Sequence, residues 1–399
     1  MEEIISRKIS AISPSSTLAI TARVKQMKQQ GIDVVNLGAG EPDFDTPYYI
    51  KEEAKKAIDE GFTKYTPVSG IKELKEAIGK KFKKDNNLDY SCEEILISCG
   101  AKHAIFNAIL TLCNEGDEVI LPSPYWVSYR EMIKIAGAKP VIIKTTYEDD
   151  FKISPQQLQE AITPKTKLLI LNTPSNPTGM VYTKDELLSL SNILVEKGIF
   201  CLSDEVYEKI IYDGEKHVSI ASLGSKIKEL TIVVNGVSKS YSMTGWRIGY
   251  AGGPKKIIQA MSNLQSHSTS NPTSISQKAA LAALEGCQKA VEGMVKDFRE
   301  RRDYIVERIN SLRKLFCVKP KGAFYVFANI SALLGRRFKD KVINDGLNFS
   351  QFLLEEAKAA VIPGNSFGDS SYIRISYATS LENLRKGMER IEMFLDKIS

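Results

Sequence analysis

The residue types best suited to covalent and anion-binding chemistry stand directly after four short apolar runs. Ala101 and Lys102 follow EILIS, Asn176 follows KLLILN, Asp204 ends IFCLSD, and Lys239 follows LTIVVNG. A lysine removed from water becomes less basic and can attack a carbonyl group. A buried acid needs a cationic partner, and free N–H groups at a helix start bind anions. These segments suggest a site for an anionic ligand with a reactive carbonyl group.

Each of these features also has an ordinary structural interpretation. Gly100 can simply allow a tight turn, Asn176 can belong to an Asn-Pro turn, and Asp204 can cap a helix that follows it. A single lysine such as Lys239 is usually a solvated surface residue. Convergence at successive strand ends favours the functional interpretation, and Arg247 adds a second cation eight residues after Lys239.

The same residues match what pyridoxal phosphate requires. This cofactor needs a lysine for its imine, an acid on the pyridinium nitrogen and cations at its phosphate. Lys239, Asp204 and Arg247 have these properties. Trp126, in SPYWVSY, adds a flat ring that can stack on the pyridine, and its alternative interpretation is a half-buried residue at a helix start.

The elements that must position these residues are predicted from hydrophobic periodicity. Amphipathic stretches predict helices at 102–112, 184–196 and 255–264, and β-branched runs predict buried strands at 94–98, 118–122, 140–144, 167–172, 199–204 and 230–236. Alternation of strand and helix is typical of an α/β fold with a doubly wound, mostly parallel sheet. Ligands of such sheets bind beyond the carboxyl ends of the strands, where the residues above stand.

The length of 399 residues and a change of pattern predict more than one domain. We expect a large cofactor-binding domain over 47–290 and a smaller α+β domain built from both chain ends. Residues 1–46 would form an N-terminal arm and part of the small domain, around a helix at 18–30. Residues 291–399 would supply the rest, and the elements predicted there are a helix at 288–315, strands at 323–328 and 372–377, and a helix at 381–397.

Composition excludes several other classes of protein. A net charge of +6 is too dilute for a nucleic-acid-binding surface. The six cysteines form no C-x-x-C pair and the three histidines are scattered, so we expect neither a disulfide framework nor a metal site. The acidic start lacks the features of a signal peptide, and no run reaches about 20 apolar residues. These features favour a cytoplasmic enzyme without nucleic-acid or membrane partners.

Nine motifs occur along nearly the whole chain: GAGEPDFDTP (38–47), KYTPVSGIKELKEAI (64–78), GAKHA (100–104), SPYWVSY (123–129), NTPSNPTG (172–179), SDEVYE (203–208), SKSYSMTGWRIGY (238–250), KPKGAFYVF (319–327) and RISYATS (374–380). In this order they resemble the fold-type I pyridoxal-phosphate aminotransferases, and most closely the bacterial-type aspartate aminotransferases. The resemblance implies a homodimer with shared active sites, in which the segment 265–273 serves the neighbouring site.

The resemblance also implies how the cofactor is bound. Lys239 would carry the cofactor and act as catalytic acid and base, Asp204 would hold the pyridinium proton, and Tyr207 would help to tune the imine. The groups at the ring are Trp126, which stacks on it, and Asn176 with Tyr207 at its 3-oxygen. The phosphate would be bound by the backbone of Ala101 and Lys102, Ser238, Arg247, and Tyr65 of a second subunit.

For the substrate, the resemblance implies contacts with Gly40, Trp126, Asn176, Arg374, Lys102, Ser15 and Thr17. Arg374 would bind the α-carboxylate, and Lys102 with the two hydroxyls would face the distal carboxylate of a dicarboxylic amino acid. We therefore expect L-aspartate and 2-oxoglutarate to give oxaloacetate and L-glutamate by a ping-pong mechanism. Some relatives also accept prephenate and carry a basic residue before Pro14, where this chain has the neutral Ser13.

Other functions remain as alternatives. The run VVNLGAGEPD contains G-x-G, but Asp43 after Pro42 stands at the third glycine position, which disfavours a dinucleotide-binding oxidoreductase. A pyridoxal-phosphate β-lyase would keep the same sheet and the same Lys239, and pyruvate release from a single substrate would identify it. An aminotransferase with a broader donor range, including aromatic amino acids or prephenate, is the nearer alternative.

Overall fold

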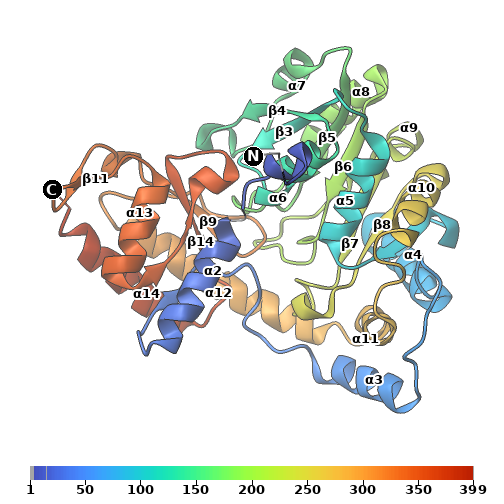
Figure 1. The fold of residues 1–399 in the computed structure, drawn as a ribbon, viewed down its shortest axis with the longest axis horizontal. Coiled ribbons are helices and arrows are strands. Elements are labelled where there is room, and N and C mark those ends of the chain that lie inside the picture. The colour runs from blue at the N-terminus through green and yellow to red at the C-terminus, as the bar shows by residue number, and fades with distance from the viewer. Residues whose placement is uncertain (1–3, 15, 399) are drawn as a thin grey trace.

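The structure is a computed structural model that describes residues 4–14 and 16–398 (Figure 1). Its largest sheet has seven strands in the order β2-β8-β7-β6-β5-β3-β4. The strands are β2 (Ile95–Ser98), β3 (Glu118–Ser123), β4 (Lys139–Lys144), β5 (Thr166–Asn172), β6 (Phe200–Asp204), β7 (Thr231–Gly236) and β8 (Gly249–Gly252). The strand β8 runs antiparallel to both of its neighbours, and the other pairs are parallel. The α/β fold with a mostly parallel sheet is therefore confirmed.

The six strands predicted for this sheet lie within one residue of their observed bounds, but β8 was missed. Its sequence, GYAG, contains no β-branched run. A Cβ atom added to Gly249 would lie 2.0 Å from the backbone nitrogen of Ala101. Glycine is therefore required there because the strand touches the start of the helix at Ala101–Leu112, and this close approach removes the usual signal of a buried strand.

Helices cover both faces of the sheet, because successive strand residues point to opposite sides. Leu168 and Ile170 of β5 face one helical layer, and Leu169 and Leu171 face the other. The first layer contains α5 (Ala101–Leu112), α6 (Val127–Ile135) and α10 (Lys255–Ser266). The second contains α7 (Pro155–Ala161), α8 (Lys184–Lys197) and α9 (Ser225–Lys228). This arrangement is the predicted doubly wound sheet.

Three further helices pack at the side of this sheet, where β2 and β8 lie. They are α3 (Tyr48–Asp59), α4 (Lys72–Asn86) and α11 (Ser274–Glu285), and α11 contacts both of the others (Figure 1). Buried residues of all three belong to one cluster that also includes Tyr207 and Tyr325. This core therefore reaches from the outer helices to the carboxyl edge of the sheet.

The C-terminal part has its own antiparallel sheet, ordered β13-β14-β9. Its elements are α12 (Lys289–Asn310), β9 (Tyr325–Asn329), β10 (Arg337–Phe338), β11 (Lys341–Val342), α13 (Gly346–Phe352), β12 (Ala359–Ala360), β13 (Ile362–Pro363), β14 (Tyr372–Ser376) and α14 (Leu381–Leu395). The helix predicted to reach residue 315 ends at Asn310. The Asn310 side chain bonds to both the N–H and the carbonyl of Cys317, and these two bonds hold the chain in a turn.

Both chain ends contribute to this second body (Figure 1). The short strand β1 (Val35–Asn36) pairs in parallel with β12, and α2 (Ser16–Gln29) packs beside β13. Leu37 continues this contact, because its N–H donates to the carbonyl of Ala360. Both ends of the chain thus build the smaller body, in agreement with the sequence prediction. The exact domain boundaries at 46 and 290 stay predictions.

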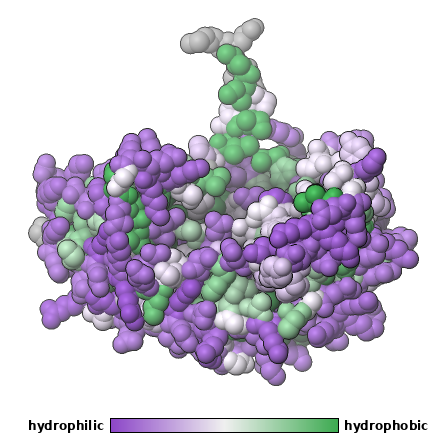
Figure 2. Space-filling model, turned by 90° about the horizontal axis from the view of Figure 1, so that it is seen from below, coloured by the Kyte–Doolittle hydropathy of each residue, from purple (hydrophilic) through white to green (hydrophobic). Residues whose placement is uncertain are grey.

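The N-terminal segment projects from the body and contacts it at α6, where the Ser13 N–H donates to the Glu131 carboxylate at 3.0 Å. It contains the short helix α1 (Arg7–Ser10), and its side chains Ile4, Ile5 and Ile9 are exposed. Figure 2 shows an apolar arm that projects from the body of the molecule. Within the described residues, no helix has both the length and the apolar character that a membrane span requires.

Candidate active site

A cavity of about 420 Å³ opens at the carboxyl edge of the main sheet, between this sheet and the C-terminal body. Of the fourteen residues predicted for the site, twelve line it: Thr17, Gly40, Ala101, Lys102, Trp126, Asn176, Asp204, Tyr207, Ser238, Lys239, Arg247 and Arg374. Of the other two, Ser15 lies outside the described residues, and Tyr65 is not part of the cavity wall. The fold thus gathers residues from seven of the quoted motifs, to which all of the twelve except Thr17 belong.

Lys239 lies in the loop that follows β7, and its amine reaches into the cavity. Its Nζ donates a hydrogen bond to the carbonyl of Gly40 at 2.6 Å. Removal from water lowers the pKa of Lys239 to about 8; Glu41 opposes this change, and Arg374 and Arg247 add to it. A neutral amine is a nucleophile and a base, so part of the Lys239 population can act as either near neutral pH.

Asp204 ends β6 and is 4% exposed. Burial raises its pKa to about 6, although hydrogen bonds from the Tyr129 hydroxyl at 2.6 Å and the Val206 N–H at 3.3 Å favour the carboxylate. A turn follows Asp204, and not the helix that the capping interpretation requires. A buried carboxylate of this kind is suited to hold a proton on a cationic ring.

Arg374 of β14 is 3% exposed and brings the C-terminal body into the cavity wall. Its two terminal nitrogens donate to the Asn176 Oδ1 at 3.0 Å and to the Gly38 carbonyl at 2.8 Å. The guanidinium carbon lies 4.3 Å from the ring centre of Tyr325, whose hydroxyl is 2.9 Å from that of Tyr207. These contacts fix a planar cation in the cavity, which is the geometry that binds a carboxylate with two hydrogen bonds.

A cationic cradle lies at the start of α5. Gly100 has a φ of +90° and precedes this helix, and no side chain caps the helix start. The Arg247 guanidinium donates to the Thr244 carbonyl at 2.6 Å and to the Cys99 carbonyl at 3.2 Å. A Cβ atom at Gly100 would lie only 2.2 Å from a terminal nitrogen of Arg247. Glycine therefore lets the Arg247 guanidinium approach the start of α5. The guanidinium and the free N–H groups of the helix start together form a binding site for an anion.

Lys102 and Trp126 form the outer wall of the cavity. The Lys102 amine lies 5.0 Å from the ring centre of Trp126, which is half-buried just before α6. Desolvation and the nearby Arg247 lower the pKa of Lys102. Lys102 and Arg247 also border a second cavity, which has a larger volume of about 880 Å³. A ligand held by Arg374 would thus have a second cation within the same cavity.

Tyr65 stands apart from these residues and is 91% exposed. It borders a surface groove together with Thr269, Ser270 and Asn271, which belong to the QSHSTSNPT segment. The two segments expected to serve a neighbouring subunit therefore lie side by side on the surface. Their role in a second subunit stays a prediction.

Several other residues of the cavity wall were not predicted from the sequence, and three of them make polar or ring contacts there. Tyr129 donates to Asp204, Tyr325 supports both Tyr207 and Arg374, and Glu41 accepts from the Thr244 hydroxyl at 2.7 Å. All three stand in quoted motifs, because Tyr129 belongs to SPYWVSY, Tyr325 to KPKGAFYVF and Glu41 to GAGEPDFDTP. Neither of the first two motifs reveals the partner of its tyrosine, since each partner comes from a distant part of the chain.

Comparisons with known proteins agree with this geometry. The family model for aminotransferase class I and II matches residues 32–391. An aspartate aminotransferase of Geobacillus stearothermophilus is 51% identical, with 98% of this chain and 99% of the relative covered. An aspartate/prephenate aminotransferase of Nitrosomonas europaea is 46% identical, with 98% and 99% covered.

The fold of this chain also matches that of a solved structure. The aspartate aminotransferase of Thermus thermophilus with maleate superimposes with a TM-score of 0.93 at 43% identity, over 98% of this chain and all of that one. Sequence and fold thus give the same result over nearly the whole length. The chain belongs to the class I and II aminotransferases, with the fold of the pyridoxal-phosphate aminotransferases of fold type I and a resemblance to those of the aspartate type.

Proposed function

We propose that this protein is a pyridoxal-phosphate-dependent aspartate aminotransferase, which transfers the amino group of L-aspartate to 2-oxoglutarate. One observation carries the proposal. A single cavity contains a lysine with lowered pKa, a buried acid, an anion-binding helix start with Arg247, and the buried Arg374. No simpler ligand would need all four groups together.

The residues of the cavity fit pyridoxal phosphate. The phosphate suits the backbone N–H groups of Ala101 and Lys102 with Ser238 and Arg247, because this end of the cavity is cationic. Asp204 suits the ring nitrogen, since burial makes a lone carboxylate there unfavourable and a protonated ring would neutralise it. Trp126, Tyr207 and Asn176 would contact the ring between these ends.

Pyridoxal phosphate supplies an aldehyde that forms imines with amines and a ring that withdraws electrons from them. Lys239 would hold the cofactor and, when released from it, move the proton between the substrate Cα and the cofactor. The neutral fraction of its amine makes this possible, because burial lowers the pKa of Lys239 to about 8. The Asp204 carboxylate would keep the ring nitrogen protonated throughout. The keto acid of the donor would leave before the acceptor binds, which gives ping-pong kinetics.

The two carboxylates of the substrate would meet opposite ends of the cavity. Arg374 would bind the α-carboxylate beside Gly40, and Lys102 with Thr17 would meet the distal carboxylate. Maleate, the compound in the Thermus thermophilus structure, is itself a dicarboxylate. The Nitrosomonas europaea relative is named for prephenate as well, and here the neutral Ser13 makes aspartate the preferred donor in this proposal.

The proposal includes a homodimer that works in the cytoplasm. Exposed Tyr65 beside residues 269–271 supports a contribution to a neighbouring site, and the apolar N-terminal arm offers surface for a second copy. All six cysteines are free thiols, as expected in a reducing compartment.

A donor panel with 2-oxoglutarate tests the proposal. Aspartate should give the highest specific activity, with an absorbance band at about 420 nm that borohydride removes, as expected for a lysine imine. Lys239→Ala should lose both the band and turnover. Alanine or aromatic donors that clearly outrank aspartate would contradict the substrate assignment, and pyruvate release without an acceptor would indicate a β-lyase. Sedimentation of the protein would test the dimer.

A further inference from the structure

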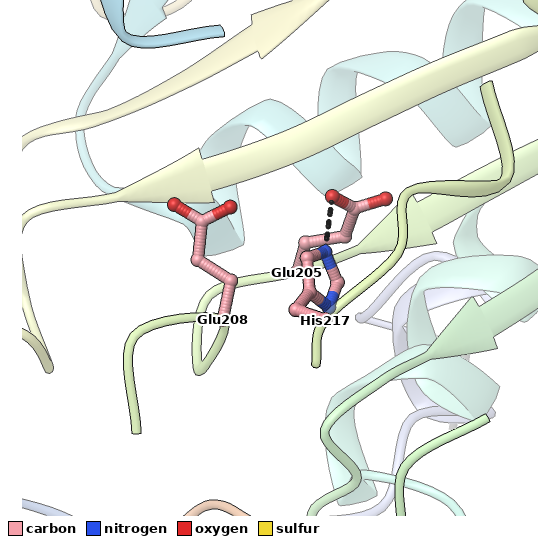
Figure 3. A group of neighbouring side chains, drawn as sticks. All are labelled: Glu205, Glu208 and His217. Atoms are coloured by element: carbon pink, nitrogen blue, oxygen red, sulfur yellow. Dashed lines mark hydrogen bonds and ion pairs between the residues drawn. The ribbon is translucent and has the colours of Figure 1, made fainter. Parts of the chain in front are cut away.

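A group of buried charged residues lies directly behind the two residues proposed to contact the cofactor ring. Glu205 and Glu208 each follow one of these residues, Asp204 and Tyr207, in the sequence SDEVYE. Figure 3 shows Glu205 paired with His217, and Glu208 close to both. Asp204 and Tyr207 line the active-site cavity, whereas the two glutamates are absent from its wall.

Glu205 is fully buried, and protein groups satisfy both of its carboxylate oxygens. One oxygen accepts hydrogen bonds from the hydroxyls of Ser203 at 2.8 Å and Ser219 at 2.7 Å. The other lies 2.8 Å from the Nε2 of His217. The Glu205 N–H also donates to Val234 of β7 at 2.9 Å, so this residue joins the end of β6 to the next strand and to the loop at 217–219.

Glu208 is satisfied in the same way from another direction. One carboxylate oxygen forms a buried ion pair with Lys81 of α4, and the other accepts from the Asn86 amide at 2.7 Å. Lys81 also donates to the Asn86 Oδ1 at 2.7 Å. Burial alone would raise the pKa of the Glu208 carboxyl. The positive charges of Lys81 and His217 outweigh burial and lower this pKa to about 2. We call Lys81, Asn86, Glu205, Glu208 and His217 the buried charge network.

Side chains of this kind can bind a metal ion, but their contacts argue against that role. Both glutamates already have protein partners, and the Lys81 ammonium occupies the position beside Glu208. A second cation there would meet an existing positive charge. We therefore consider how the buried charge network holds the turn at 204–208, which carries Glu205 and Glu208.

We infer that the buried charge network positions Asp204 and Tyr207 for the cofactor ring, an inference that rests on the proposed function. In the turn at 204–208, Asp204, Val206 and Tyr207 line the cavity, whereas Glu205 and Glu208 lie behind it. Fixing the two glutamates therefore also fixes the direction of the neighbouring Asp204 and Tyr207. Anchors come from α4, from the loop at 217–219 and from β7. Side chains held by such contacts keep a preset geometry without help from the ligand.

The double variant Lys81→Met/Glu208→Gln tests this inference, because it removes the ion pair without leaving a buried unpaired charge. The matched control is Lys152→Met/Glu186→Gln, which removes a partly buried ion pair from the layer that contains α8. Three quantities are measured in each protein: the melting temperature of the apoprotein, the dissociation constant of pyridoxal phosphate, and the visible circular dichroism of the bound cofactor.

Both double variants should lower the melting temperature. Only the network variant should also weaken binding of pyridoxal phosphate, by roughly three- to tenfold as expected for one misplaced hydrogen bond, and reduce its visible circular dichroism. The milder Ser219→Ala, which removes one donor to Glu205, should shift both cofactor readouts in the same direction and replaces the double variant if that does not fold.

Unchanged affinity and circular dichroism in a folded network variant would overturn the inference and assign the network to stability alone. Equal loss of cofactor affinity in the control would overturn it as well. The wild-type titration separates this result from the proposed function, because a wild-type protein that binds no pyridoxal phosphate would contradict the proposed function itself.

Discussion

Replacing Lys102 with methionine should convert a selective enzyme into a less selective one. The substitution keeps an unbranched side chain that is one atom shorter and removes its charge at the cavity wall, where the Lys102 amine lies 5.0 Å from the ring centre of Trp126. Aspartate would lose a partner for its distal carboxylate, whereas alanine has no such group. Arg374, which we propose binds the carboxylate common to both donors, is unaffected.

The magnitude follows from the kind of contact. A hydrogen bond to a charged group contributes about 1.5 to 3 kcal/mol, and solvent access to Lys102 favours the lower end of this range. A loss of about 1.5 to 2 kcal/mol corresponds to a fall in kcat/KM of roughly 10- to 30-fold for aspartate. The value for alanine should stay within about threefold of the wild type. Because the contact is partly solvated, added salt should also reduce the wild-type preference.

Steady-state kinetics with both donors, at fixed 2-oxoglutarate, measure this difference. Lys167→Met is the matched control, since the Lys167 amine also lies over an aromatic ring, that of Phe200, at 5.4 Å. The control should leave both donors unchanged. An equal fall for aspartate and alanine in Lys102→Met would refute the distal-carboxylate role and would instead indicate a role in cofactor binding.

Three further predictions follow from the cavity. Arg374→Lys should reduce kcat/KM for aspartate and alanine alike, by about 100-fold or more in the same assay, because one ammonium cannot replace a forked guanidinium. Gly100→Ala should weaken pyridoxal phosphate binding in a cofactor titration by about tenfold or more, since its Cβ would displace Arg247; Gly31→Ala, with φ +77° and open space, should not. Burial lowers the pKa of Lys239 from 10.5 to about 8, so the unfolded chain binds this proton more readily. Denaturant unfolding should find apo Lys239→Met more stable than apo wild type by about 3 kcal/mol at pH 7, and the gap should close between pH 8 and 10.5. A constant gap would contradict the shift.

The main sheet could be predicted from the sequence because its strands carry strong local signals. In β5, Leu168 to Leu171 are buried on both faces, and this produces a continuous apolar run. The strand β8 carries no such signal, because contact with α5 requires glycine where an apolar side chain would otherwise stand. Contacts between distant backbones leave only a glycine in the sequence, and glycine is equally common in turns and at helix ends.

The candidate site was predictable to the extent that its residues stand at strand ends. Asp204 and Lys239 follow from that rule, but their partners Tyr129 and Gly40 come from distant segments, so no local pattern reports these two hydrogen bonds. The same holds for His217, whose pairing with Glu205 depends on a loop that turns back beneath β6. Scattered histidines in a sequence therefore do not exclude a charged cluster in the fold.

The pairing of β1 with β12 has a consequence for the order in which the protein is made. A ribosome releases residues 35–37 more than 300 residues before their partners at 359–360. The strands of the main sheet, between residues 95 and 252, can pair during this interval, as segments synthesised early generally fold first. Arg374 emerges after the whole main sheet, so a nascent chain would hold Lys239 before it holds the guanidinium that we propose binds the substrate carboxylate.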